Sequence, residues 1–330
     1  MKRLAVCGWD ERTAALLRAI SLRSDLRAVA IGDDRPASLV RAKSATGLPC
    51  YQHLREMLRA VEYDAVLISD TADREALVQL AAERHASVLI RGDVANASTL
   101  RAATEAVSTG AEALSIVRPE FHHAGIELLR NLTNSDLEWA PQVLHIELSD
   151  PNGVAAALSA VSALVVRLQP VEATQVAVAT LRAHSDMPVS ATLQIRHGER
   201  ALSVITVHDR LDERWRIAIE AAWGTAEFTN REAVTSLTIE PAGAKAEQSE
   251  LVDDDLLDLE AVRLADPASR RIDERCAPHE AALLTAIEAS MSTGFVTPVR
   301  DPGARGNLRV LQGGQATTSR RAGHLRVLGS

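Results

Sequence analysis

The first 120 residues alternate short apolar runs with amphipathic segments, and this alternation restricts the fold more than any other feature of the chain. Runs such as 26–32 and 64–69 are apolar at nearly every position, as expected for strands buried on both faces of a sheet. Parallel strands need helical crossovers, so we predict a doubly wound, Rossmann-like α/β domain over residues 1–122. The expected strands are 4–7, 26–32, near 50, 64–69, 87–91 and 113–117, and the expected helices are 12–22, 37–46, 53–61, 74–84 and 95–107.

The pattern changes to a period of two after residue 122. In residues 189–197, four apolar side chains alternate with polar ones, which is typical of a strand with one buried face. Segments 144–148, 215–221 and 237–239 follow the same rule. We therefore predict a second, α+β domain over residues 123–330, built on an open and mainly antiparallel sheet. Its expected helices are 122–132, 153–168, 278–292 and 304–321, and a last strand is expected at 325–328.

Composition excludes several classes of protein. The net charge of −8 is spread along 330 residues, which argues against a nucleic-acid partner. The most apolar stretch, 154–166, is too short to span a membrane, so a buried helix is expected there. Three widely spaced cysteines without a C-x-x-C pair, and a chain that opens directly on a strand, favour a cytoplasmic protein without a signal peptide. The histidines show no metal-ligand spacing, so no metal site is expected.

The turn after the first strand has one glycine where a phosphate-binding turn has three. In the pattern G-x-G-x-x-G the middle glycine lets the backbone approach a pyrophosphate, and here the three positions are Gly8, Asp10 and Thr13. Two readings stay open. Asp10 is a favourable N-cap that would place its own carboxylate where a phosphate would bind, and the alternative is productive pyrophosphate binding despite the added charge.

The order of these segments resembles the glucose-fructose oxidoreductase / inositol dehydrogenase (Gfo/Idh/MocA) family over nearly the whole chain. The resemblance is carried by "MKRLAVCGWDERTAALLRAI", by "LRAVAIGDDRP", by residues 46–58 and 63–95, and by the tail from 283 to 328. It implies a nicotinamide cofactor, NAD or NADP, if any cofactor binds. The cofactor-binding positions implied by the resemblance are Gly8, Trp9, Asp33, Asp34, Ser69 and Thr71.

The catalytic positions of that family are altered in this chain. After its fourth strand the family has E-K-P, whose lysine is the usual catalytic residue, and the matching residues here are Arg91, Gly92 and Asp93. The family also has an acid and a histidine on one helix of the second domain. Aligned from Gly153, those positions fall on the apolar or small residues Ala157, Ser159, Val161 and Leu164. We therefore expect this helix to belong to the core.

The leading hypothesis is therefore a catalytically degenerate protein with this fold, without assigned catalytic residues, that acts as a binding or assembly component. It would form a homo-oligomer, or a hetero-oligomer with a related and active subunit, through the exposed face of the second sheet. The alternative is an active NAD(P)-dependent sugar or polyol oxidoreductase with relocated groups, for which Glu120, His122 and His123 are the candidates. A third hypothesis is a sensor that holds a sugar-like ligand between the domains without a cofactor.

Overall fold

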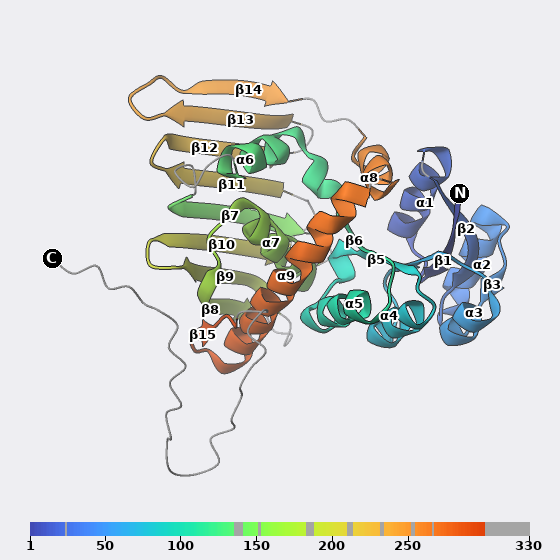
Figure 1. Ribbon diagram of the computed structural model, residues 1–330. Helices are drawn as coiled ribbons and strands as arrows, with labels where there is room; N and C mark the ends of the chain where they lie inside the picture. The colour runs from blue at the N-terminus through green and yellow to red at the C-terminus, as the bar shows by residue number, and fades with distance from the viewer. Residues whose placement is uncertain are drawn as a thin grey trace, which may run out of the picture.

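A computed structural model describes residues 1–300, apart from 24, 135–140, 151–152, 183–187, 210–213, 232–233, 252–254 and 266. Two sheets stand side by side, joined by helices that run between them (Figure 1). The expected helix 304–321 and strand 325–328 lie outside the described residues. No described helix has the length and apolar character that crossing a membrane requires.

The first sheet confirms the predicted doubly wound fold. Its six strands are all parallel, in the order β3-β2-β1-β4-β5-β6. The strands are β1 (Lys2–Cys7), β2 (Leu26–Gly32), β3 (Cys50–Tyr51), β4 (Ala65–Ile68), β5 (Ser87–Arg91) and β6 (Leu114–Val117). The helices between them are α1 (Glu11–Arg23), α2 (Pro36–Thr46), α3 (Leu54–Ala60), α4 (Arg74–Glu83) and α5 (Ala97–Thr109).

The second sheet is mixed and mainly antiparallel, as predicted, with one parallel pair between β7 and β10. The order is β14-β13-β12-β11-β7-β10-β9-β8-β15. Ala191, Leu193 and Ile195 point to its buried face, which confirms the predicted alternation. The strands are β7 (Val143–Asp150), β8 (Ala173–Arg182), β9 (Pro188–His197), β10 (Ala201–Asp209), β11 (Arg214–Ala221), β12 (Gly224–Arg231), β13 (Val234–Pro241), β14 (Glu247–Leu251) and β15 (Thr297–Pro298).

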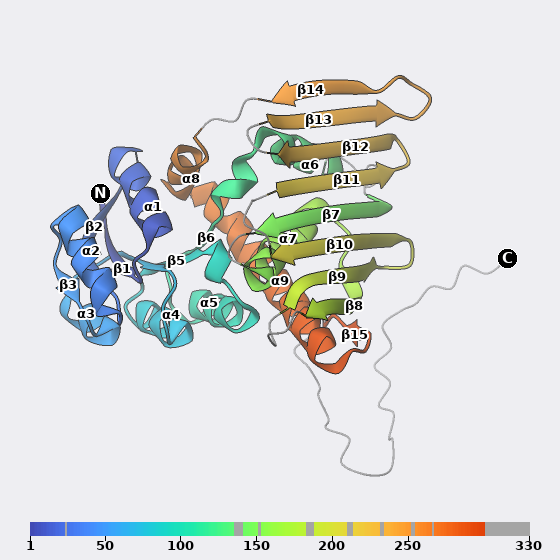
Figure 2. The ribbon, with the colours of Figure 1, turned by 180° about the vertical axis from the view of Figure 1, so that it is seen from behind.

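Helices cover only one face of this second sheet. Helices α6 (Ala124–Asn134), α7 (Val154–Leu168) and α9 (Pro267–Thr293) lie on that side, and no helix of the described residues lies on the opposite, bare face (Figures 1 and 2). The buried side of α7 packs on the sheet through residues such as Val161 and Leu164, so the expected buried helix is confirmed. Helix α8 (Leu256–Ala265) returns to the first sheet and packs against α1.

Two predicted helix starts are wrong. The helix expected from residue 122 begins at Ala124, because a 3-10 turn, Pro119–His122, precedes it. The helix expected from Pro278 begins eleven residues earlier and runs through the proline. Proline usually starts or breaks a helix because it lacks an N–H group. Here the helical segment before Pro278 is held by contacts of its side chains with the first sheet.

Those contacts close the free edge of β6. The N–H groups of Leu114, Ile116 and Arg118 point away from β5, and side-chain carboxylates accept all three. Asp273 accepts the Ile116 N–H at 2.8 Å, and Glu274 accepts the Leu114 N–H at 3.2 Å. Both carboxylates come from the helical segment that precedes Pro278. An edge strand is a template for unwanted pairing, and here α8 and α9 cover it.

Buried and partly buried arginines compensate the charge of these carboxylates. Arg263 donates to Glu260 at 2.6 Å, to Asp273 at 2.7 Å and to the Ile116 carbonyl at 2.7 Å. Arg167, at the end of α7, donates to Asp273 at 2.8 Å. Arg118, only 1% exposed in its side chain, pairs with the fully buried Glu280 at 3.0 Å. The network therefore joins both sheets through paired charges rather than through apolar contact alone.

We expect Asp273→Ala to lower the free energy of unfolding by about 3–5 kcal/mol, because it removes one carboxylate partner from each of two partly buried guanidinium groups and leaves one buried strand N–H without its acceptor. Urea denaturation followed by circular dichroism measures the change. The control is Glu247→Gln on the exposed strand β14, for which a change below about 0.5 kcal/mol is expected. A loss at Asp273 no larger than the control would contradict the role given to this network.

Candidate functional site

The expected site lies where β1, β2, β4 and β5 end, beside the turn that leads into α1. Gly8 adopts a φ of +93°, which favours glycine, and its Cα packs against the backbone of the loop after β4. A Cβ added at Gly8 would lie 2.9 Å from the carbonyl oxygen of Asp70. This glycine therefore allows two loops of the protein to touch each other.

Asp10 caps α1, so the N-cap expected at this turn is present. Its Oδ1 accepts the Thr13 N–H at 2.8 Å. The same carboxylate pairs at 2.5 Å with Arg91, whose side chain is 6% exposed. Burial alone would raise the pKa of Asp10, but the bonds from Arg91 and Thr13 outweigh it and hold the pKa below its ordinary value. A fixed negative charge thus stands at the amino end of α1.

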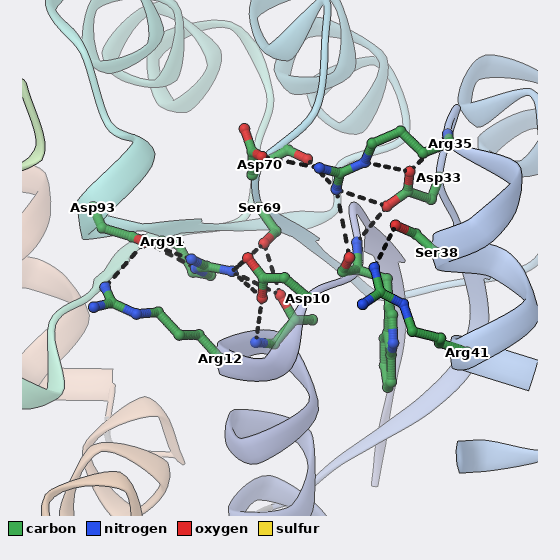
Figure 3. A network of polar contacts seen from close by, with 12 residues as sticks. Asp10, Arg12, Asp33, Arg35, Ser38, Arg41, Ser69, Asp70, Arg91 and Asp93 are labelled. Carbon is green, nitrogen blue, oxygen red and sulfur yellow. Dashed lines mark hydrogen bonds and ion pairs between the residues drawn. The ribbon is translucent and has the colours of Figure 1, made fainter. Parts of the chain in front are cut away.

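Arg91 ends β5 and lies at the centre of one ion network (Figure 3). Besides Asp10, its guanidinium bonds the hydroxyls of Ser69 at 2.7 Å and Thr13 at 2.9 Å. It also pairs with Asp93, which in turn accepts from the exposed Arg12 at 3.2 Å. Both carboxylates beside Arg91 are therefore already matched by cations of the chain itself.

A second network surrounds Asp33, the acid at the end of β2 (Figure 3). One oxygen accepts the Arg35 backbone N–H at 2.8 Å and its Nε at 3.0 Å, and the other accepts the Trp9 N–H at 2.7 Å and Arg35 Nη2 at 3.0 Å. A carboxylate offers about four lone-pair sites, and all of those of Asp33 are used. Arg35 also reaches Asp70 across the turn, at 3.2 Å.

The other expected cofactor-binding residues differ in burial and in hydrogen bonding. The Trp9 ring is buried in the core with Leu16 and Ile20, and only its backbone faces the turn. Asp34 is exposed, while Ser69 is buried and already bonded. Thr71 is buried, and its hydroxyl has no hydrogen-bond partner among the described residues. Asp73 precedes α4 and makes no capping bond.

These groups do not fit a nicotinamide dinucleotide, the cofactor that the fold implies. A ribose hydroxyl would need an acceptor at Asp33, whose four sites are filled. A pyrophosphate would meet the Asp10 carboxylate at the start of α1. Two like unit charges about 4 Å apart repel by about 4 kcal/mol at an effective dielectric of about 20.

The face of α7 that lines the space between the sheets consists of alanines. Ala156 and Ala160 border it, and the aligned positions Ala157 and Val161 lie one residue further on and are fully buried. Neither pair of positions carries a group that could transfer a proton. Ser159 faces the first domain and donates to the Gly92 carbonyl at 2.8 Å.

A cleft of about 460 Å³ lies between these alanines and the ends of the first sheet. Its walls include the alternative catalytic candidates Glu120 and His123, but His122 does not border it. His122 lies at 2.7 Å from the buried carboxylate of Glu260, so it belongs to the network around β6. The remaining polar lining comes from Arg12, Arg91, Asp93, Asp150 and Asn230, together with the ring of Trp215.

Sequence reasoning missed the two arginines that organise this region. The sequence places Arg91 only in the altered E-K-P segment and gives Arg35 no role. The charge pattern could have indicated both arginines. Arg91 lies at the end of a strand and Arg35 shortly after one, and each has an aspartate two residues away, Asp93 or Asp33. Among the described residues no group of three or more potential metal ligands is found.

Solved structures with the same fold include several oxidoreductases. One is an oxidoreductase from Agrobacterium radiobacter in complex with NAD+, L-tartaric acid and magnesium, with a TM-score of 0.74 and 13% identity over 90% of this chain and 98% of that one. Another is levoglucosan dehydrogenase in complex with NADH and levoglucosan, with a TM-score of 0.73 and 12% identity over 91% and 100%. An NAD-binding oxidoreductase from Klebsiella pneumoniae has a TM-score of 0.72 and 12% identity over 91% and 99%.

These similarities confirm the fold expected from the resemblance to the Gfo/Idh/MocA family, with both sheets included. No protein-family model matches the sequence, and no curated protein matches it either. At 12–13% identity the likeness is one of architecture, so the chemistry of this chain has to be argued from its own side chains.

The buried pair of Glu260 and His122 predicts a pH dependence of stability. Burial opposes ionisation of Glu260, but His122 and Arg263 outweigh it and lower its pKa from 4.5 to about 2. The folded state therefore holds the carboxylate ionised where the unfolded chain takes up a proton. Its contribution is complete above the ordinary value near 4.5 and is lost as the pH falls toward about 2.

We expect the free energy of unfolding to fall below pH 4.5 in the wild type and to fall less steeply in Glu260→Gln. One proton bound only on unfolding corresponds to about 1.4 kcal/mol per pH unit. Urea titrations at several pH values between neutrality and the acid limit give both slopes. Equal slopes in the two proteins would show that Glu260 does not titrate in this way.

Proposed function

We propose that this protein keeps the fold of NAD-dependent sugar dehydrogenases but not their hydride-transfer chemistry, and that it acts as a binding or assembly component. The observation that carries the proposal is the saturation of Asp33. The acid that would hold a cofactor ribose already accepts four hydrogen bonds from Trp9 and Arg35. Binding a dinucleotide would require breaking these bonds without an equivalent replacement.

The pairing of Asp10 with Arg91 supports the same conclusion at the pyrophosphate position. A free arginine beside a helix N-terminus would attract phosphate, but Arg91 is compensated by Asp10 and Asp93. The helix dipole is likewise compensated by the Asp10 carboxylate. The site therefore has no uncompensated positive charge among its described residues with which to bind two phosphates.

The surroundings of the cleft support a loss of catalysis. Hydride transfer to or from a sugar hydroxyl needs a group that accepts or supplies the hydroxyl proton. Ala156 and Ala160 occupy the α7 face of the cleft. Gly92 stands at the position that the resemblance assigns to the family's lysine, and the neighbouring Arg91 remains protonated at physiological pH, so it cannot act as a proton shuttle.

The cleft itself remains suited to a small polar ligand. Asp150, Glu120 and Asn230 offer acceptors and donors, and the ring of Trp215 offers an apolar surface. Polar groups around an aromatic ring suit a sugar or polyol, whose faces alternate between hydroxyl and C–H groups. A sugar-like ligand held without a cofactor is therefore the binding role that the cleft supports.

One observation favours the alternative of an active NAD(P)-dependent oxidoreductase. Glu120 and His123 both border the cleft, and a histidine is the commonest general acid–base residue. His123 packs on the Phe228 ring, with centroids 5.9 Å apart, and its Nε2 lies 3.3 Å from the Asn230 amide. This alternative requires a dinucleotide to open both arginine networks, so cofactor binding decides between the two functions.

Calorimetric titration with NADH and with NADPH tests the proposal directly. We expect no binding at millimolar cofactor, and no change in hydrogen exchange at the Trp9 and Thr13 amides, because both N–H groups are bonded to carboxylates. Micromolar binding of either dinucleotide would contradict the proposal and favour the active enzyme.

A matched pair of variants tests the reason for the expected failure to bind. Arg35→Ser removes two of the four hydrogen bonds to Asp33, so we expect adenosine, which carries no phosphate, to bind this variant measurably. Arg41→Ser is the control, since Arg41 is exposed on α2 and contacts only Ser38 at 3.4 Å. Equal affinity of the two variants for adenosine would contradict the explanation that the hydrogen bonds of Arg35 to Asp33 prevent ribose binding.

The bare face of the second sheet is the surface that we propose for assembly, with a second copy or with a related subunit. It is broad and polar, with exposed Thr192 and Gln194 and an ion pair between Arg216 and Glu227 at 3.0 Å. Val204 lies half-buried near its centre, on β10 and opposite His145 and Gln194. Specific interfaces bury about 1,200–2,000 Å² in total, which a face of nine strands can supply.

Sedimentation velocity at micromolar concentration tests this surface. We expect the wild type to sediment as an oligomer and Val204→Glu to sediment as a monomer, because the added charge would be buried without a partner. The matched control is Val262→Glu, which adds the same charge to an exposed position on α8, away from the sheet face. A monomeric wild type would overturn the proposed assembly.

A further inference from the structure

A second cavity lies away from the cleft, between the end of α7, the middle of α9 and the start of β8. It also has a volume of about 460 Å³, and no residue borders both spaces. This size falls within the range of small-molecule sites. Neither the proposed function nor the likeness to oxidoreductases assigns it a role.

The walls of this cavity are mainly aliphatic. Two polar side chains on the wall, His197 and Gln169, already use their hydrogen-bonding atoms within the protein. The His197 ring bonds the Val171 carbonyl at 3.0 Å and the Ser203 hydroxyl at 2.8 Å, and burial lowers its pKa to about 4, so it is neutral. Gln169 donates to the Pro141 carbonyl at 2.9 Å. The aliphatic lining consists of Val165, Val166, Pro170, Val171, Ala173, Ala282, Leu283 and Val299.

The mouth of the cavity is cationic. Arg275 and His279 stand one turn apart on α9, and Arg300 follows β15. Within the described part of the chain neither guanidinium is paired with a carboxylate. The one acidic residue of the lining is Glu172, whose carboxylate lies 4.0 Å from His279. An aliphatic interior below two exposed arginines is complementary to a molecule with an apolar body and one anionic end.

We propose that this cavity binds an aliphatic carboxylate. The hydrocarbon part of the ligand would lie against the valines, and its carboxylate would lie at Arg275 and Arg300. A carboxylate is favoured over an uncharged lipid, because an anion can pair with the two guanidinium groups at the mouth. Cys276 also lines the cavity, so its thiol reports on occupancy. Burial raises the pKa of this thiol, so labelling requires alkaline pH.

Calorimetric titration of the full protein chain with octanoate, octanol and acetate separates the contributions of the ligand's hydrocarbon tail and of its charge to the binding affinity. We expect octanoate to bind at least tenfold more tightly than octanol, and acetate not to bind. In the series from hexanoate to decanoate, each added carbon should raise the affinity about fourfold until the cavity is filled. Equal binding of octanoate and octanol would overturn the proposal.

Two variants locate the site. Arg275→Gln should weaken octanoate binding about tenfold and leave octanol binding unchanged, whereas Arg271→Gln, exposed on the same helix but outside the cavity, should change neither. Ala282→Trp should fill the cavity and abolish binding of both probes. Identical octanoate affinity in Arg275→Gln and Arg271→Gln would refute the assignment of the carboxylate to this mouth.

Protection of Cys276 gives an independent readout on the unmodified protein. Octanoate should slow maleimide labelling of Cys276 at alkaline pH and leave the labelling of Cys50, in the other sheet, unchanged. Both sites are followed by peptide mass spectrometry. Full protection of Cys276 before any octanoate is added would also overturn the proposal, because it would mean that the cavity is not open to a ligand.

Discussion

The compensation of buried carboxylates by arginine is the interaction on which the rest of the structure depends. At β6, carboxylates from α8 and α9 accept the N–H groups of an edge strand, and Arg118, Arg167 and Arg263 balance their charge. Taking such charges out of water costs several kcal/mol per ion, and only close pairing with further hydrogen bonds offsets that cost. Each member therefore fixes the position of its neighbours, and the two sheets are held in one arrangement.

The same chemistry determines the character of the crevice at the ends of the parallel strands. In a Rossmann-like domain the strand ends present a free acid and a free helix N-terminus to the ligand. In this chain Arg35 and Arg91 bond to those groups, so the crevice is stabilised by the protein itself (Figure 3). Closing the crevice satisfies polar groups that a cofactor would otherwise satisfy. The fold can thus remain stable without the ligand around which its architecture is arranged.

Much of the fold follows from local patterns. Strands β1 to β6 and their helices were predictable because a fully buried strand and an amphipathic helix have different apolar periods. The extent of α9 was not predictable, because Pro278 argues for a helix start and the carboxylates that hold the preceding segment contact residues about 160 positions away. Likewise, nothing near His122 in the sequence indicates that Glu260 is its partner.

The sequence alone determined the alternation of elements, the loss of the glycines and the N-cap at Asp10, because each depends on residues within a few positions of one another. Only the tertiary structure decided what the charged side chains do. Arg91 meets Asp10 across 81 residues, and Arg35 meets Asp70 across 35. Whether an arginine binds a ligand or a neighbouring aspartate depends on which acceptor the fold brings within hydrogen-bonding distance, and no local pattern encodes that distance.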